Sequence, residues 1–463
     1  MSFPAYPAYK DSGVEWLGVV PEHWSVKPLR YLGRFRKGLT ITKADLTDTG
    51  IPCLNYGEVH SLYPFEVNQD IQALKCVPAE YLETEPSSCI NYGDFVFADT
   101  SEDLEGVGNF THVSGLEPLF AGYHTIIYSL DSDVSSRFLA YCLESFAFRT
   151  QLRMGVKGVK VFSVTQEILR GGIAWLPTTA EQTQIALFLD HETARIDALI
   201  EEQQRLIELL KEKRQAVISH AVTKGLDPTV PMKDSGVEWL GEVPVHWEIG
   251  GLTRFIGPVV DYRGRTPTKV DDGIFLVTAR NIRNGRIDYE ASEEYADPES
   301  AESLLARGRP EIGDLLFTME APLGQVALID RTDIALAQRI VKFRGEPSVM
   351  RNHYLMFWFM STNCQARLET LATGSTALGI KSSKLGMIEC LAPTLNEQDA
   401  IISHVQRESE KNDALVYEAE NVIGLLQERR SGLIAAAVTG KVDVRGWQPP
   451  ASTASPELAQ EAV

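Results

Sequence analysis

The nine letters K-D-S-G-V-E-W-L-G occupy residues 10–18 and return unchanged at residues 233–241. A second motif, V-P-x-H-W, follows each copy, at residues 20–24 and again at residues 243–247. Because internal repetition fixes the architecture of a chain before any secondary structure is assigned, this repeat has to be explained first. A repeat of this length in a chain of 463 residues indicates that the protein is built as two halves of one design.

Shorter and less exact repeats continue through the rest of both halves. G-D-F-V-F at residues 93–97 returns as G-D-L-L-F at residues 313–317. Glu-Gln at residues 181–182 and Ala-Val-Thr at residues 221–223 return at residues 397–398 and 437–439. The whole chain is therefore predicted to be a tandem duplication, apart from a short C-terminal extension.

Each half changes character along its length. Its first part mixes short β-rich runs with Gly, Pro and Asn, which indicates an α+β globular domain. Its last part has no proline, almost no glycine, and apolar residues at helical spacing. We predict a first globular domain at residues 1–178, a long helix at 179–224, a second globular domain at 225–394, a second long helix at 395–440 and a disordered tail at 441–463.

The two predicted helices carry heptad-like seams, which favour a coiled coil. The first seam contains Leu189, Ile196, Gln203, Leu210 and Val217, beside Leu199 and Leu206. The second contains Val405, Asn412, Ala419, Leu426 and Leu433, beside Leu415 and Val422. If the helices pair, the second must run back along the first, so we expect an antiparallel pair. A helix of about 40 residues is roughly 60 Å long, which suits a spacer.

This antiparallel arrangement explains why the nine-letter motif occurs twice. The copy at residues 233–241 follows the first helix directly, whereas nothing similar follows the second helix. We therefore expect residues 10–18 to dock at the C-terminal end of the second helix and close a pseudo-twofold ring. Trp16 and Trp239 are expected to act in packing, because tryptophan side chains are mostly buried.

Composition narrows the class of protein. The formal net charge is −19, with 44 basic and 63 acidic residues, so any contact with nucleic acid must be local and not due to bulk charge. The six cysteines show no C-x-x-C pair, which predicts neither a zinc cage nor a disulfide framework. The N-terminus lacks the pattern of a signal peptide and no apolar run is long enough to cross a bilayer. We expect a cytoplasmic protein without a membrane span.

Motifs for catalysis are missing or imperfect. His191-Glu192 resembles the start of H-E-x-x-H, but position 195 is Arg. The run G-S-T-A-L-G-I-K-S at residues 374–382 is one residue too long for a phosphate loop. There is no G-x-S-x-G, no G-x-G-x-x-G and no Asn/Asp-Pro-Pro-aromatic run. We therefore predict a recognition protein that is not an enzyme and has no catalytic residue, no metal site and no cofactor of its own.

Basic and amide residues gather in loops of both halves. Arginine can pair with guanine, asparagine with adenine, and lysine with phosphate, which makes these residues candidates for contact with DNA. The alternative, ordinary solvated loops, is as good for any single residue. Residues 157–160 and 374–384 form glycine-containing turns before each long helix and fit a phosphate-gripping turn or a plain turn equally well. The loop candidates are Arg36, Lys37, Lys43, Tyr262, Arg263, Arg265, Lys269, Arg280, Asn281 and Arg283.

Together these motifs resemble the specificity subunit of type I restriction-modification enzymes. The likeness rests on the two K-D-S-G-V-E-W-L-G and V-P-x-H-W openings, the G-D-x-x-F strands, the turns G-V-K-V-F-S-V and G-S-T-A-L-G-I-K, and the Glu-Gln starts and Ala-Val-Thr ends of the helices. It extends to about residue 445.

The resemblance implies a fold and a function. Two pseudo-twofold-related α+β target-recognition domains would each read one half of a split, asymmetric sequence in double-stranded DNA. The two antiparallel helices between them would set their separation. Two modification subunits, which bind S-adenosylmethionine, would dock on the helices and methylate adenines, and a restriction subunit with motor and nuclease activity would join for cleavage.

Carried over by position, the resemblance also implies which residues read DNA. One difference between the halves stands out, because Gly57-Glu58 occupies the place of Arg280-Asn281, so the two domains are expected to read different half-sites. Glu58 would accept a hydrogen bond from a cytosine amine or be structural. The implied readers are Arg36, Lys37, Asn55, Tyr56, Lys157 and Lys160 in the first domain, and Tyr262, Arg263, Arg265, Arg280, Asn281, Gln338, Arg339 and Lys381 in the second.

Two other classes of function stay open at this point. One is a pseudo-dimeric coiled-coil scaffold that binds proteins without reading DNA. The other is an enzyme built around residues 374–382, which binding of a labelled nucleotide would test.

Overall fold

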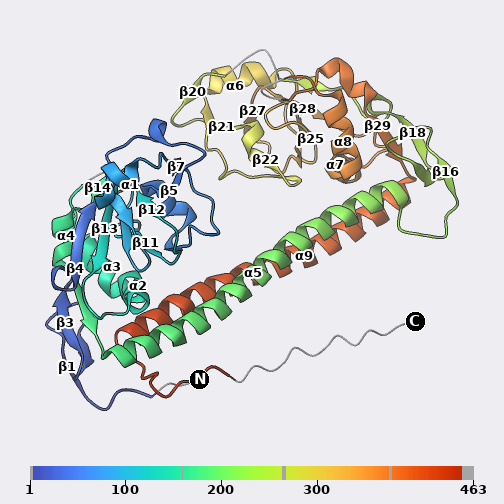
Figure 1. The fold of residues 1–463 in the computed structure, drawn as a ribbon. Coiled ribbons are helices and arrows are strands. Elements are labelled where there is room, and N and C mark those ends of the chain that lie inside the picture. Colours follow the sequence, from blue (N-terminus) through green and yellow to red (C-terminus); the bar gives the residue numbers. More distant parts are fainter. Residues whose placement is uncertain (1–3, 159, 263–266, 375–377, 451–463) are drawn as a thin grey trace. The chain divides into compact units, whose positions relative to one another are not determined.

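The computed structural model describes residues 4–158, 160–262, 267–374 and 378–450. The chain divides into two compact units, residues 1–202 with 422–463 and residues 203–421. Each unit contains one α+β domain and one half of each long helix (Figure 1). The division is what a duplicated chain with an antiparallel helix pair is predicted to show.

In unit 1 the domain is built on two sheets. The five-stranded sheet has the order β4-β13-β9-β11-β6, and the four-stranded sheet has the order β7-β5-β12-β8. The strands of the first sheet are β4 (Gly33–Lys37), β6 (Phe65–Val67), β9 (Phe95–Ala98), β11 (Phe110–Val113) and β13 (Thr125–Leu130). Those of the second are β5 (Ile51–Leu54), β7 (Cys76–Val77), β8 (Cys89–Ile90) and β12 (Leu119–Ala121). Two helices, α2 (Ser136–Glu144) and α3 (Phe146–Gly155), contribute buried side chains to the main core.

Unit 2 repeats this plan with two four-stranded sheets, of order β19-β28-β25-β26 and β20-β24-β21-β27. The first contains β19 (Val260–Asp261), β25 (Leu315–Thr318), β26 (Val326–Leu328) and β28 (Ile340–Phe343). The second contains β20 (Lys269–Val270), β21 (Ile274–Val277), β24 (Tyr295–Ala296) and β27 (Ile334–Leu336). Helices α7 (Asn352–Met360) and α8 (Thr362–Leu371) take the places of α2 and α3.

The G-D-x-x-F motif marks the same buried strand in both units. Asp94 precedes β9 and accepts a hydrogen bond from Arg36, while Asp314 precedes β25 and accepts one from Lys342 at 2.7 Å. Both carboxylates also accept from a backbone N–H three residues earlier. The aspartate of this motif is therefore an anchor that closes the turn into the strand and ties it to a neighbouring basic side chain.

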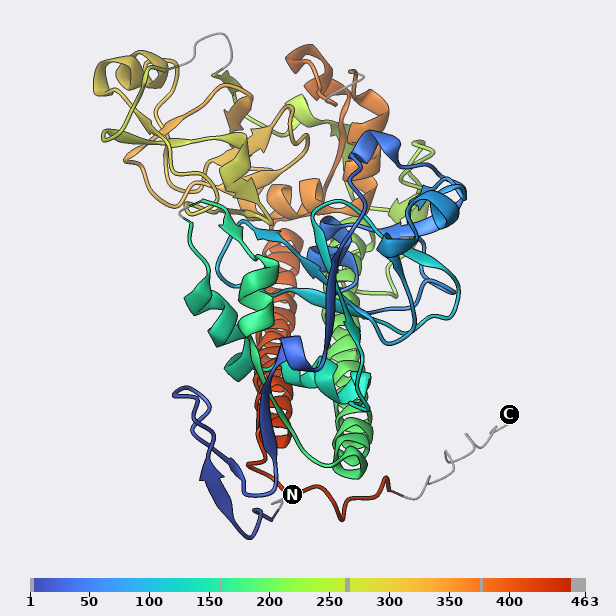
Figure 2. The same cartoon turned by 60° about the vertical axis from the view of Figure 1, so that its left-hand side comes forward.

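The two long helices are α5 (Thr179–Lys224) and α9 (Leu395–Val438). In unit 1 Asp197 near the start of α5 pairs with Arg430 near the end of α9, at 2.8 Å. In unit 2 Arg214 pairs with Asp413 at 3.1 Å. The helices are therefore antiparallel in both units, and the two views of Figures 1 and 2 show them side by side. The predicted fold class, two α+β domains with an antiparallel coiled coil, is confirmed.

One predicted seam of each helix is buried or half-buried, with Gln203, Val217, Leu426 and Leu433 half-buried, and the other is exposed. Leu189, Ile196 and Leu210 on α5, and Val405, Asn412 and Ala419 on α9, are buried. The adjoining residues Leu199, Leu206, Leu415 and Val422, which were also predicted to lie in the coiled coil, are exposed. A pair of helices buries only one stripe on each member, so the second stripe has no partner within either unit.

Residues on either side of the first nine-letter copy dock on the end of α9, whereas docking of residues 10–18 themselves stays a prediction. The Tyr9 hydroxyl donates to the Gly440 carbonyl at 3.0 Å, and the Asp443 N–H donates to the Pro4 carbonyl at 2.8 Å. Trp24 is fully buried against Gly440, as Trp247 in unit 2 is against Gly225. The ring of unit 1 is therefore closed by two segments from opposite ends of the chain.

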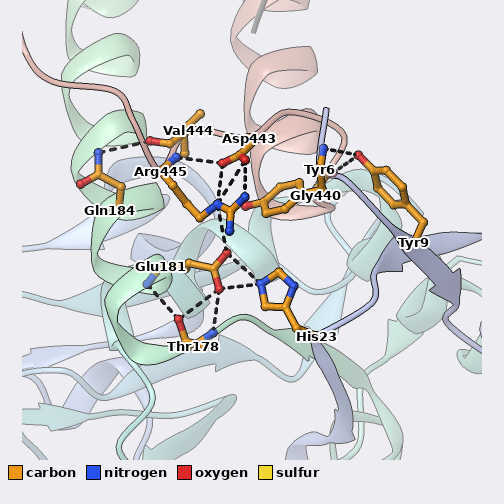
Figure 3. A network of polar contacts seen from close by, with 10 residues as sticks. All are labelled: Tyr6, Tyr9, His23, Thr178, Glu181, Gln184, Gly440, Asp443, Val444 and Arg445. Atoms are coloured by element: carbon orange, nitrogen blue, oxygen red, sulfur yellow. Dashed lines mark hydrogen bonds and ion pairs between the residues drawn. The ribbon is translucent and has the colours of Figure 1, made fainter. Parts of the chain in front are cut away.

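A network of polar contacts, drawn in Figure 3, surrounds this closure. Glu181, in the first turn of α5, accepts hydrogen bonds from His23 at 2.8 Å and from the Thr178 hydroxyl at 3.0 Å. Arg445 binds Asp443 and lies over the Tyr6 ring, 4.8 Å from its centroid. The Arg445 guanidinium holds the pKa of the Asp443 carboxyl below its usual value. The network thus links the N-terminal segment, the start of α5 and the chain beyond α9.

The prediction that a disordered tail begins at residue 441 is wrong for its first residues. Val444 is fully buried, and Trp447 packs on Phe188 with ring centroids 5.2 Å apart. Gln184 donates hydrogen bonds to the carbonyls of both Val444 and Trp447. The missed signal is Trp447 itself, because a tryptophan beyond a helix end is more often packed than exposed.

All six cysteines are free thiols, and five of them are buried. Burial raises the pKa of the Cys53 thiol to about 12, which leaves it protonated and unreactive. None of the described helices is long and apolar enough to cross a membrane. Within the described ranges no group of three or more His, Cys, Asp or Glu side chains could hold a metal ion.

Candidate nucleic-acid interface

A parallel strand pair lies at the same place in both domains and carries the candidate site. β5 runs beside β12 in unit 1, and β21 runs beside β27 in unit 2. Just beyond each pair one more backbone hydrogen bond forms, from Gly122 N–H to the Leu54 carbonyl at 2.7 Å and from Ala337 N–H to the Val277 carbonyl at 2.9 Å. These matching bonds establish which residues of the two domains are equivalent.

The loop after the first strand of each pair is held by a side chain that caps its backbone. In unit 1 the Glu58 carboxylate accepts from the Asn55 N–H at 3.0 Å. In unit 2 the Asn281 amide oxygen accepts from the Thr278 N–H at 2.8 Å and from its hydroxyl at 2.9 Å. The same frame therefore places Tyr56-Gly57 in unit 1 where unit 2 has Ala279-Arg280.

The loop after the second strand contains a residue with left-handed backbone. His124 has a φ of 55° and Arg339 a φ of 81°, a conformation that is uncommon for residues other than glycine. The His124 carbonyl accepts from the Asp99 N–H at 3.1 Å, and the Arg339 carbonyl accepts from the Met319 N–H at 2.8 Å. Tyr123-His124 in unit 1 is thus equivalent to Gln338-Arg339 in unit 2. Because left-handed residues outside glycine gather at functional sites, this position is a candidate for contact with a ligand.

In unit 2 the two loops line a basic cavity of about 190 Å³. Arg280 lines it from the first loop, and Gln338 and Arg339 line it from the second. Two of the basic side chains form ion pairs. Arg339 pairs with Glu320 at 3.1 Å, and Lys269 pairs with Glu294 at 2.6 Å. Both pairs are partly solvent-exposed, so exchanging them for contacts with an anion or a base costs little.

In unit 1 the equivalent place is a cavity of about 730 Å³ whose lining includes the rings of Tyr56, His60 and His124, while Tyr123 contacts Tyr56 from outside the lining. The Tyr56 ring lies 5.7 Å from the Tyr123 ring and 5.6 Å from the His124 ring. His124 pairs with Asp99 at 3.1 Å, and three more acidic residues, Glu102, Asp103 and Glu105, line the cavity. Burial and then Glu58 raise the pKa of Tyr123, so its hydroxyl stays protonated and can donate a hydrogen bond.

The turns that precede the long helices adjoin these cavities. The Val164 N–H donates to the Asp99 carbonyl, and the Ile380 N–H donates to the Met319 carbonyl at 2.9 Å. The exposed side chains of Lys157, Lys160 and Lys381 lie on these turns. Lys37 and Lys43 are also exposed in unit 1. That these five lysines contact DNA stays a prediction.

Four predicted readers are placed elsewhere, and these predictions are corrected. Tyr262 is fully buried, and its hydroxyl donates to the Gly308 carbonyl. Asn281 is also fully buried and uses its amide for the cap and for the carbonyls of Asp288 and Ser292. Asn55 is 1 % exposed, and the Arg36 guanidinium is taken up by Asp94, Ser129 and two carbonyls. Polar residues in glycine-rich loops fit capping as well as base contact, and here capping is what they do.

The other predicted residues differ in where the structure places them. Tyr56, Arg280, Gln338, Arg339 and Lys269 line the two cavities. Arg283 is exposed but pairs with Asp288 at 3.2 Å, away from that lining. Arg263 and Arg265 lie outside the described residues. Glu58, left open between base contact and structure, serves as a cap.

Sequence reasoning missed Tyr123 and His124 entirely. They are equivalent to Gln338 and Arg339, which were predicted, but no letter is shared between the two pairs. Counting from the end of the β12 and β27 strands could have found them, since both pairs lie at the same distance from the following strand. Identical residues show which strands and loops of the two halves are equivalent. The site residues differ between the halves and are found only from their positions relative to those strands.

Comparisons with known proteins bear on what this interface is. No family model matches the chain. The type I restriction enzyme EcoKI specificity subunit of Escherichia coli K12 is 21 % identical over 446 residues, which cover 93 % of this chain and 91 % of that protein. The chain resembles a type I specificity subunit over nearly its whole length. The EcoBI specificity subunit of Escherichia coli is 20 % identical over 324 residues, covering 68 % of this chain and 67 % of that protein.

Solved structures agree on the fold. A chain from a type I restriction-modification system, described for its complex assembly and conformational transition, has a TM-score of 0.66 and 14 % identity, covering 91 % of this chain and 99 % of that one. The HsdS subunit of Thermoanaerobacter tengcongensis has a TM-score of 0.50 and 15 % identity, with coverages of 91 % and 98 %. At these identities the likeness establishes the shared fold of type I specificity subunits and leaves the residues that read DNA to be argued from this chain.

Proposed function

We propose that this chain is the DNA sequence-recognition subunit of a type I restriction-modification complex. Its two domains would bind the two halves of a bipartite, asymmetric target in double-stranded DNA. The observation that carries the proposal is a frame built twice, with the same backbone hydrogen bonds but different exposed side chains at its reading positions. Such a protein would hold two unlike sites and perform no catalysis itself.

The second, exposed stripe of each helix supports the docking of two modification subunits. Leu199, Leu206 and Leu209 on α5 return in the same spacing as Leu415, Val422 and Leu425 on α9. All six side chains are exposed, by 38 % to 65 %. Spacings of seven and three residues place each trio on one face of its helix. Two copies of one apolar stripe fit two copies of one partner.

These partners would bring the chemistry that this chain lacks. The modification subunits would bind S-adenosylmethionine and methylate adenines, and a restriction subunit would join them for cleavage. The net charge of −19 fits this division, because the partners would then supply much of the grip on phosphate.

Mapping methylated adenines tests the proposal directly. The chain is expressed with the modification subunits of its native host, and the modified sites in the genome are compared with those of cells lacking the chain. We expect one split motif that depends on the chain. Absence of any chain-dependent motif would favour the protein-binding scaffold, which the exposed apolar stripes also fit.

Docking is tested separately with two double variants. Leu206→Asp with Leu209→Asp removes the stripe on α5, and Val422→Asp with Leu425→Asp removes the one on α9. Each is expected to lower the number of bound modification subunits from two to one, measured as the mass of the purified complex. A matched control is Glu212→Asp, an exposed change on the same helix. Unchanged mass in both double variants would contradict docking on these stripes.

A further inference from the structure

The equivalent reading positions of the two domains carry opposite chemistry. In the alignment of the two units, Gly57 is equivalent to Arg280, Tyr123 to Gln338 and His124 to Arg339, as the shared backbone bonds establish. Unit 2 therefore offers two guanidinium groups and an amide at one cavity, whereas the residues lining the cavity of unit 1 include aromatic rings and three carboxylates but no arginine.

We propose that Arg280 and Arg339 are the specificity-determining residues of the second domain and that each selects a guanine in its half-site. The first domain would select a different base pair at the equivalent place, through Tyr56, Tyr123 and His124. This inference rests on the proposed function and names the residues and the base chemistry of that same site.

The choice of guanine follows from what an arginine can recognise. A guanidinium donates two parallel hydrogen bonds to the O6 and N7 atoms of guanine in the major groove, and no other base presents two acceptors there. Gln338 beside Arg339 adds a group that can pair with adenine, so the half-site is expected to contain both purines or their complements. A phosphate contact would need neither a fork-shaped donor nor a neighbouring amide.

The placement of Arg339 supports a role beyond packing. Its φ of 81° is unfavourable for a side chain with a Cβ, and glycine would relieve it. Nevertheless, Arg339 is exposed, and its ion pair with Glu320 is exposed by 48 % and 45 % on the two sides. An exposed ion pair of this kind contributes little stability, so packing does not explain an arginine there.

Among the residues that line the cavity of unit 1, none can donate two parallel hydrogen bonds as an arginine does. Its rings form edge-to-face contacts, and His124 is turned toward Asp99. An aromatic edge can contact the methyl group of thymine, and the Tyr123 hydroxyl can donate one hydrogen bond. The first half-site is therefore expected to contain an A·T pair at the position where the second contains G·C.

The test is a methylation map of reading-site variants in the assembled complex. The chain is expressed with its modification subunits, and adenine methylation is measured on a library of duplexes in which every position of both half-sites is randomised. The variants are Arg280→Ala, Arg280→Lys, Arg339→Gly and Arg339→Lys. Glycine is used at position 339 because it keeps the left-handed backbone without strain. The control is Arg254→Ala, an exposed arginine of the same unit that also pairs with a glutamate.

The expected result is a roughly ten- to hundredfold loss of preference for guanine at one position of one half-site, with the other half-site unchanged. The lysine variants should lose it too, because lysine keeps the charge but not the two parallel donors. Tyr123→Ala and His124→Gly should alter only the other half-site. The control should keep the wild-type motif.

Three outcomes would overturn the inference. The second half-site could lack a guanine in the wild-type motif, or the motif could survive all four arginine variants. Alternatively, the lysine variants could behave as wild type, which would make Arg280 and Arg339 phosphate contacts. If the wild-type complex produced no motif at all, the failure would be that of the proposed function and not of this assignment.

Discussion

Replacing Trp24 tests the closure of unit 1 more sharply than any other single change. The side chain is fully buried, lies against Gly440 beyond the end of α9, and forms an edge-to-face contact with Tyr6 at 5.8 Å. Truncating a buried tryptophan to alanine costs about 3–5 kcal/mol. The Trp24 indole N–H is buried without a hydrogen-bond partner among the described residues, so its removal also relieves an unmet donor. We therefore expect Trp24→Ala to destabilise unit 1 by about 3 kcal/mol.

The equivalent change in unit 2 is the matched control. Trp247 is as deeply buried and lies on Gly225, but its indole N–H donates to the Glu397 carboxylate at 3.3 Å. Losing a hydrogen bond to a charged group adds roughly 1.5–3 kcal/mol. Trp247→Ala is thus expected to cost more than Trp24→Ala, although the two side chains and their settings are otherwise alike.

Native-state hydrogen exchange reads out where each variant loses stability. About 3 kcal/mol corresponds to a roughly hundredfold loss of protection for amides that open with the unit. In Trp24→Ala this loss should include residues 432–438 of α9, although they lie more than 400 positions from Trp24 along the chain. In Trp247→Ala it should include the end of α5 instead. Unchanged protection at residues 432–438 in Trp24→Ala would refute the reasoning that the N-terminal segment holds the end of α9.

Three further changes test the frame of the domains. Burial and then Arg137 lower the pKa of His112 to about 4, so the folded protein binds a proton at this residue less readily than the unfolded chain. The free energy of unfolding should therefore fall by up to about 3 kcal/mol as the pH is lowered from about 6.5 to 4. In a series of denaturant melts, His112→Gln should reduce this dependence on pH. Asp314→Ala leaves the Lys342 ammonium buried without its carboxylate and should cost about 3–5 kcal/mol of unfolding free energy, clearly more than Asp314→Asn in the same melts. Asn281→Ala removes the cap of its loop and should lower stability by about 2 kcal/mol; a variant of unchanged stability but altered methylation motif would return Asn281 to the list of base readers.

The architecture could be predicted because it depends on features that sequence displays directly. A duplicated motif, helical spacing without proline, and the need for the second helix to return are enough to infer two domains, an antiparallel pair and a contact between the N-terminal segment and the end of α9. What spacing alone could not decide was which of two apolar stripes on each helix is buried. Leu199 and Leu206 are as apolar as Ile196 and Leu210, and only the packing within each unit separates them.

The candidate site was harder to predict, because base contact and capping use the same residue types. Asn281 and Arg280 are neighbours in one loop, yet Asn281 turns inward to hold the backbone and Arg280 turns outward to line the cavity. The type of residue therefore does not distinguish a capping role from contact with a base. The difference lies in which backbone N–H groups need an acceptor, and that is known only once the path of the loop is known.

The duplication explains how one frame can hold two unlike sites. The bonds that define the reading loops run between backbone groups, from Gly122 to Leu54 and from Ala337 to Val277, and so they do not depend on the side chains that the loops expose. Substitutions at residues 56, 57, 123 and 124, or at their equivalents, can therefore change what is contacted without altering the strands beneath. By contrast, Glu58 and Asn281 are both polar because each accepts a hydrogen bond from a backbone N–H of its loop. A protein built this way can change its target one half at a time, since the groups that would read DNA and the groups that hold the fold are different residues.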